Sequence, residues 1–165
     1  MGRAWKGPAG PKLRLLPTLL TLDDLRARAV AFDQVSQREP ITNHILLGVD
    51  EQNLAPTGLA PDDHLLYLYG DSGSGKSSML RAYAYEVMRL YQPDQAQLFV
   101  VDYRRALLGD IPPSYLSAYL TTHESAQEMM AGLAATVRQR LPGPDVTPQQ
   151  IAERSWWKGK EVFVL

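Results

Sequence analysis

Residues 70–77 of this 165-residue chain read GDSGSGKS, which matches the pattern G-x-x-x-x-G-K-[ST] in full. The apolar run LLYLY at 65–69 precedes this segment, and a helical pattern follows it. A strand, a glycine-rich loop and a helix in this order predict a phosphate-binding loop, because the loop amides and the positive end of the helix converge on an anion. We expect Lys76 to reach the β- and γ-phosphates of a nucleotide and Ser77 to place its hydroxyl on Mg²⁺.

Composition narrows the class of protein. Hydrophobic residues make up 45% of the chain and charged residues 21%, which indicates a globular domain with a core. The net charge of −1 gives no strong attraction to nucleic acid or to an anionic membrane. The absence of cysteine excludes a disulfide scaffold, a thiolate zinc site and a cysteine nucleophile. Because the chain also lacks an apolar run of membrane-spanning length and a signal peptide, we expect a cytoplasmic location.

Capping residues and hydrophobic periodicity predict alternating helices and strands. Residues 1–17, rich in glycine and proline, are expected to form a linker or arm. Helices are predicted from the cap Thr21 toward Phe32, from the loop to Pro93, over 122–140, and from Thr147 onward. Met129 and Met130 in the third helix are interpreted as core filling. Strands are predicted at 45–49, 55–59, 65–69, 98–101, 117–120 and 162–165.

Nucleotide hydrolysis needs a carboxylate that holds the Mg²⁺ water shell, usually at the carboxyl end of a neighbouring strand. No residue follows the apolar run at 162–165, and Glu161 precedes it, at the opposite edge of the sheet. Asp102, after the run at 98–101, is the remaining acidic candidate for a phosphate or Mg²⁺ role. The alternative is that Asp102 caps its own loop or pairs with Arg104 or Arg105. These two arginines either stabilise charge across a subunit or domain interface, or they are structural or solvated.

Other chemistry-bearing side chains give weaker signals. Trp156 and Trp157 are adjacent, so they cannot share one helix face, and they serve either core packing or a partner-facing patch. Capping or surface roles are predicted for three isolated histidines that lack a second ligand at metal spacing, namely His44, His64 and His123.

Several segments together resemble a known family. The segments are LGVDE at 47–51 before LAP at 54–56, the loop at 70–77, VDYRR at 101–105 with LLG at 107–109, and RLPGPDVTP at 140–148 with RSWW at 154–157. They are similar to the EccC-type ATPases of type VII (ESX) secretion, which belong to the FtsK/SpoIIIE class. The resemblance covers about residues 15–165, nearly the whole chain.

The resemblance implies an α/β fold of the RecA-like P-loop NTPase type, with a mainly parallel sheet flanked by helices. Residues 18–165 would form the N-terminal portion of one such ATPase domain, incomplete at the C-terminus. ATP and Mg²⁺ would be the cofactors, with Ser77 on the Mg²⁺. The residues implied to bind the nucleotide, partly through backbone amides, are Ser72, Gly73, Ser74, Gly75, Lys76, Ser77 and Ser78.

The resemblance also implies protein partners and a cellular location. Such modules assemble with other ATPase modules or subunits as hexameric rings at the cytoplasmic face of the membrane, and they export small helical proteins. The Walker B acids of the family are missing, and so is the strand that would lie between the Walker A and Walker B strands. We therefore expect a fragment that is inactive and poorly stable alone. Two alternatives are a DNA translocase module and a degenerate nucleotide-binding scaffold without turnover.

Overall fold

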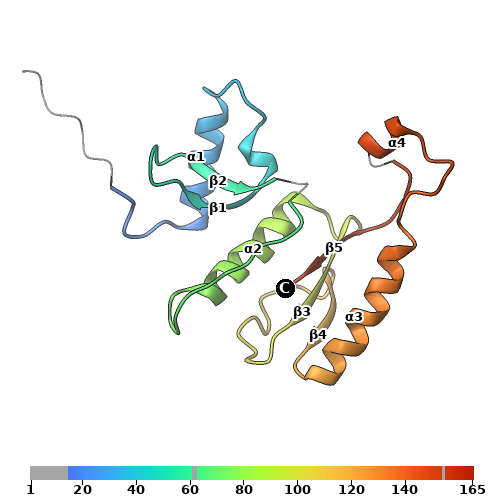
Figure 1. Ribbon diagram of the computed structural model, residues 1–165. Coiled ribbons are helices and arrows are strands. Elements are labelled where there is room, and N and C mark those ends of the chain that lie inside the picture. The colour runs from blue at the N-terminus through green and yellow to red at the C-terminus, as the bar shows by residue number, and fades with distance from the viewer. Residues whose placement is uncertain (1–14, 61–62, 154) are drawn as a thin grey trace, which may run out of the picture. The chain divides into compact units, whose positions relative to one another are not determined.

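The computed structural model describes residues 15–60, 63–153 and 155–165 (Figure 1). These divide into two compact units, one within Met1–His64 and one within Leu65–Leu165, and each is described by itself. Part of the predicted arm, residues 1–14, lies outside the described residues. The prediction that residues 18–165 belong to a single ATPase domain stays a prediction.

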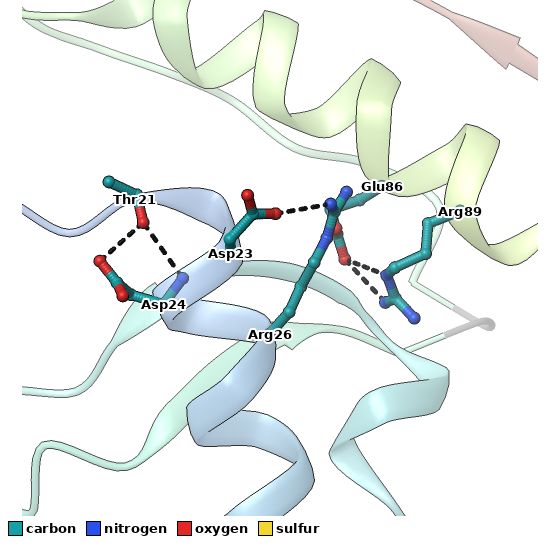
Figure 2. Close-up of polar contacts among 6 residues, drawn as sticks. All are labelled: Thr21, Asp23, Asp24, Arg26, Glu86 and Arg89. Atoms are coloured by element: carbon teal, nitrogen blue, oxygen red, sulfur yellow. Dashed lines mark hydrogen bonds and ion pairs between the residues drawn. The ribbon is translucent and has the colours of Figure 1, made fainter.

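The first unit consists of a helix, a short 3-10 helix and a β-hairpin. The helix α1 (Leu22–Asp33) begins at the predicted cap, where the Thr21 hydroxyl accepts the Asp24 amide at 3.1 Å (Figure 2). The core of the unit forms around Leu25, Ala29 and Leu46, which are buried. The remaining elements are η1 (Ile41–Asn43) and the antiparallel strands β1 (Ile45–Val49) and β2 (Pro56–Leu59).

Asp33, the last residue of α1, connects this helix to η1 through hydrogen bonds of its side chain. Its carboxylate accepts the backbone amides of Ile41 and Thr42, at 2.8 and 3.0 Å, and the Thr42 hydroxyl at 2.6 Å. Partial burial acts to raise the pKa of Asp33, but these hydrogen bonds and the nearby His44 outweigh it and lower the pKa below its ordinary value. The charged carboxylate therefore holds the turn that leads into the hairpin.

The second unit has helices and a parallel sheet, whose strands lie in the order β4 (Leu116–Leu120), β3 (Ala96–Val101) and β5 (Glu161–Val164) (Figure 1). In the central strand, Leu98 and Val100 are buried, as the continuous apolar run predicts. The Phe163 ring of β5 lies near two tyrosine rings, with ring centres 6.3 Å from Tyr83 in α2 and 5.4 Å from Tyr91, the residue that caps the end of α2. The elements are α2 (Lys76–Leu90), β3 (Ala96–Val101), β4 (Leu116–Leu120), α3 (His123–Arg138), α4 (Pro148–Ala152) and β5 (Glu161–Val164).

The predicted capping pattern at 147–150 is confirmed. The Thr147 hydroxyl accepts the Gln150 amide at 3.2 Å, and the Gln150 side chain accepts the Thr147 amide at 2.9 Å. This reciprocal pair satisfies two amides at the start of α4 that no helical carbonyl can reach. In α2, the predicted helix after the loop, Glu86 is fully buried and pairs with Arg89 at 2.7 Å (Figure 2).

The prediction of a strand at 65–69 is wrong. This segment has no regular secondary structure, and Leu65, Tyr67 and Tyr69 are exposed by 68%, 67% and 87%. A strand needs a neighbour that pairs with its amides and carbonyls, and among the described residues no strand pairs with this segment. Its apolar pattern is therefore that of a strand, while its hydrogen bonding is that of a loop.

The interpretation of the third helix as core filling is only partly correct. Ala126 is buried, whereas Met130 is 45% exposed and Val137 is 44% exposed. Met129 is half-buried. Within the described part of the chain, other residues bury the apolar side chains only near the start of α3. The apolar stripe extends beyond this buried part, and its later residues are exposed.

Candidate functional site

The glycines of the loop at 70–77 adopt backbone conformations that other residues avoid. Gly73 has φ +80° and Gly75 has φ +90°, both in the left-handed region, and Gly75 is the N-cap of α2. A Cβ on Gly70 would lie only 2.5 Å from the Ser74 hydroxyl oxygen. The loop thus turns sharply into the helix, and the sequence folds this way because glycine stands at each tight position.

The loop and the first turn of α2 present unpaired backbone amides. The Ser74 amide donates to the Asp71 carbonyl at 3.2 Å, and the Met79 amide donates to the Gly75 carbonyl at 2.9 Å. Helix geometry leaves the first amides of α2 without a partner. In this described segment, the amides with no protein acceptor are those of Gly70, Asp71, Ser72, Gly73, Gly75, Lys76, Ser77 and Ser78. Such a group of donors at a helix N-terminus fits a phosphate group.

The Lys76 ammonium folds back over the loop. Its Nζ donates to the Gly70 and Asp71 carbonyls, both at 2.6 Å, and to the Ser74 hydroxyl at 3.3 Å. The cation therefore already lies beside the unpaired amides. A polyphosphate with Mg²⁺ fits this donor set, because Lys76 and the amides would bind phosphate oxygens and the Ser77 hydroxyl would be left for the metal.

A cavity of about 260 Å³ adjoins the first turn of α2. Ser77 and Leu80 line it from the helix, and the segment after β3 lines it with Asp102 and Arg104. Leu165, after β5, also lines it. The cavity is thus at the carboxyl ends of parallel strands, where ligands bind in open α/β sheets.

Asp102 acts as a cap for its own loop, which is one of the two roles that the sequence left open. Its carboxylate accepts the backbone amides of Arg104 at 3.1 Å and Leu107 at 2.8 Å, and the Tyr119 hydroxyl at 2.7 Å. Burial acts to raise the pKa of Asp102, yet these hydrogen bonds lower it overall. Burial and the hydrogen bond to Asp102 raise the pKa of Tyr119 to about 12. With three donors on its oxygens, Asp102 is poorly suited to bind a metal ion directly.

A second support of this loop comes from Arg81 in α2, and no sequence pattern indicated this role. Arg81 Nε donates to the Asp110 carboxylate at 2.7 Å, and an Nη atom donates to the Ala106 carbonyl at 2.8 Å. The partners lie 29 and 25 positions away, so neither helical spacing nor a motif links them. The contact joins the segment after β3 to the helix that begins at Lys76.

The other predicted candidates lie outside this site. The Trp156 indole donates to the Arg140 carbonyl at 2.6 Å, and the Arg140 guanidinium lies 4.3 Å from the centre of the Trp157 ring. Both tryptophans are half-buried and hold the segment that leads to β5. Within the described ranges no histidine belongs to a group of three or more potential metal ligands.

These features define a P-loop nucleotide-binding fold, and comparison with known proteins gives the family. The family model described as "FtsK/SpoIIIE family" matches residues 27–145. The chain therefore belongs to the FtsK/SpoIIIE family. This family of ATPases implies nucleotide binding, usually with Mg²⁺.

The relatives are secretion ATPases. The chain is 35% identical over 164 residues to the ESX secretion system protein EccC of Thermomonospora curvata and 32% identical over 160 residues to EccC4 of the ESX-4 system of Mycobacterium tuberculosis. These matches cover 98% and 96% of the chain but only 12% of each relative. The chain thus spans about an eighth of the length of these relatives.

Solved structures agree with the fold. A structure of ATPases 2 and 3 of Thermomonospora curvata EccC, in complex with a signal sequence peptide, matches with a TM-score of 0.74 and 33% identity. The match covers 98% of this chain and 27% of that one. The prediction of a RecA-like α/β fold is confirmed. No helix in the described part of the chain is long and apolar enough to cross a membrane.

Proposed function

We propose that this chain is an ATP-binding module of a type VII secretion motor, in which the loop at 70–77 binds Mg·ATP. The observation that carries the proposal is the group of unpaired amides around the Lys76 ammonium, at the start of α2. In this proposal, the amides of Ser72, Gly73, Ser74 and Gly75 hold the phosphate oxygens once the loop has adjusted to the ligand.

Three further residues complete the proposed site. Lys76 leaves its loop carbonyls and contacts the β- and γ-phosphates, and Ser77 gives its hydroxyl to Mg²⁺. Ser78 adds its amide from the first turn of α2. Bound Mg²⁺ would neutralise phosphate charge, and the role of the chain is to position that charge.

Titration calorimetry with Mg·ATP tests this proposal. We expect the wild-type chain to bind and Lys76→Ala to lose at least about tenfold in affinity, because charge-assisted bonds to phosphate are lost. Lys158→Ala is the matched control, since Lys158 is an exposed lysine outside the site. Equal affinity in the Lys76 and Lys158 variants would refute the assignment of the loop.

The wider role rests on the relatives. They are named as ESX secretion system proteins, and one solved relative holds a signal sequence peptide. We extend this to the present chain: it works with other ATPase modules in a hexameric ring at the cytoplasmic face of a membrane, and it couples ATP to the export of helical proteins. Sedimentation of the chain with and without Mg·ATP tests the assembly, and a nucleotide-dependent shift toward larger species is expected.

A further inference from the structure

The segment from Asp102 to Asp110 is held more firmly than an ordinary loop. The Asp102 carboxylate accepts hydrogen bonds from the Arg104 and Leu107 amides of this segment, and the Tyr119 hydroxyl of β4 donates to the same carboxylate. Arg81 holds its far end through Asp110. Five side-chain hydrogen bonds, including the one from Arg81 to the Ala106 carbonyl, thus fix the position of a loop that borders the cavity beside Ser77.

The two arginines of this loop differ in their placement. Arg104 lines the cavity together with Ser77, whereas Arg105 does not. Arg105 has φ +54°, a left-handed conformation that costs about 1–2 kcal/mol outside glycine. The loop keeps this turn because Asp102 and Arg81 hold it on both sides. Because the backbone turns at Arg105, the two arginines differ in their surroundings, and only Arg104 lines the cavity.

The charge of Arg104 is available for a ligand. Both arginines are exposed, and among the described residues the Arg104 guanidinium has no ion pair or hydrogen bond. The cavity lies next to Ser77, the proposed Mg²⁺ ligand, and therefore at the terminal-phosphate end of a bound nucleotide. A guanidinium presents a planar fork of donors that matches phosphate oxygens.

We propose that Arg104 binds the terminal phosphate of the nucleotide from within the same chain, and that Asp102 and Arg81 are positioning residues that hold it at the site. This inference rests on the proposed binding of Mg·ATP at the loop. It assigns the arginine to recognition of the γ-phosphate, so Arg104 would distinguish ATP from ADP.

The test compares two neighbouring arginines. Calorimetry measures Mg·ATP and Mg·ADP binding to the wild-type chain, Arg104→Gln and Arg105→Gln, which lose the same charge from the same loop. We expect Arg104→Gln to weaken Mg·ATP binding by about tenfold or more and Mg·ADP binding by less than about twofold. Arg105→Gln should change neither by more than about twofold. Arg104→Lys, which keeps the charge without the fork, should recover part of the lost affinity.

Each outcome has a defined meaning. Equal losses for ATP and ADP, equal effects of the two glutamine variants, or no recovery with Arg104→Lys would overturn the assignment while leaving the proposed function intact. If the folded wild-type chain binds neither nucleotide, the proposed function itself fails and this inference fails with it. Circular dichroism of all four proteins confirms that each is folded before binding is compared.

Discussion

Single residues set the shape of the loop, and Gly75 shows this most directly. Its φ of +90° is strained for any side chain, although nothing lies within 4 Å of where a Cβ would be. We therefore predict that Gly75→Ala destabilises the chain by about 1–2 kcal/mol through backbone strain alone. Urea denaturation measures the change. Gly143→Ala is the control, since Gly143 has open space and no left-handed φ, and a loss as large as that of Gly75→Ala would contradict the argument.

Asp33 makes the stability of the folded chain depend on pH. Its folded-state pKa lies below the ordinary value of 3.8, so its contribution to stability is fully present above that pH and is lost as the pH falls through the folded-state pKa. Asp33→Asn removes this contribution. We predict that the two proteins differ most in free energy of unfolding near neutral pH and converge as the solution is acidified. Denaturation curves from pH 7 to about pH 2 test this, and a constant difference would contradict it.

At the scale of elements, the central strand β3 carries the packing of the second unit. Leu98 is fully buried, so Leu98→Ala should cost about 2–5 kcal/mol through lost contacts and a residual cavity. Val164→Ala in β5 is the matched control, since Val164 is 44% exposed and should cost below about 1 kcal/mol. Tryptophan fluorescence in urea reports both. Similar losses in the two variants would show that β3 is not the core of this unit.

Local signals predicted most elements, because capping and periodicity depend on near neighbours. Thr21, Thr147 and the glycines of the loop each act within a few residues, and the structure places the helices where these signals predict. The strand at 65–69 was predicted wrongly because a strand also depends on a partner, which its own residues do not encode. The Arg81–Asp110 pair could not be predicted for the same reason, since its partners meet only in the folded chain.

At the scale of the site, the sequence predicted the loop but not its surroundings. Lys76 and Ser77 follow from the motif, whereas the cavity lined by Ser77 and Arg104 depends on how the segment after β3 returns to α2. Asp102 was left open between a ligand and a cap, and only its hydrogen bonds to Tyr119 and two amides favour the cap.

At the scale of the whole molecule, net charge bears on the alternative of a DNA translocase. With a net charge of −1, the chain lacks the excess of basic residues that neutralises phosphates along a duplex. We predict no salt-dependent binding of duplex DNA. Fluorescence anisotropy at about 50 and 200 mM salt checks this, and binding that weakens by about tenfold or more between these conditions would favour the translocase.

The three contacts of the Lys76 ammonium have a consequence for binding affinity. The Gly70 and Asp71 carbonyls and the Ser74 hydroxyl compete with an incoming phosphate for the Lys76 ammonium. The cation must exchange these three acceptors for phosphate oxygens when a ligand binds. The measured binding free energy is therefore the difference between the contacts of Lys76 with phosphate and its contacts with the loop. It is smaller than the contacts with phosphate alone would give. Until a polyanion arrives, the two carbonyls and the hydroxyl stabilise the charge of the Lys76 ammonium and hold its side chain over the loop.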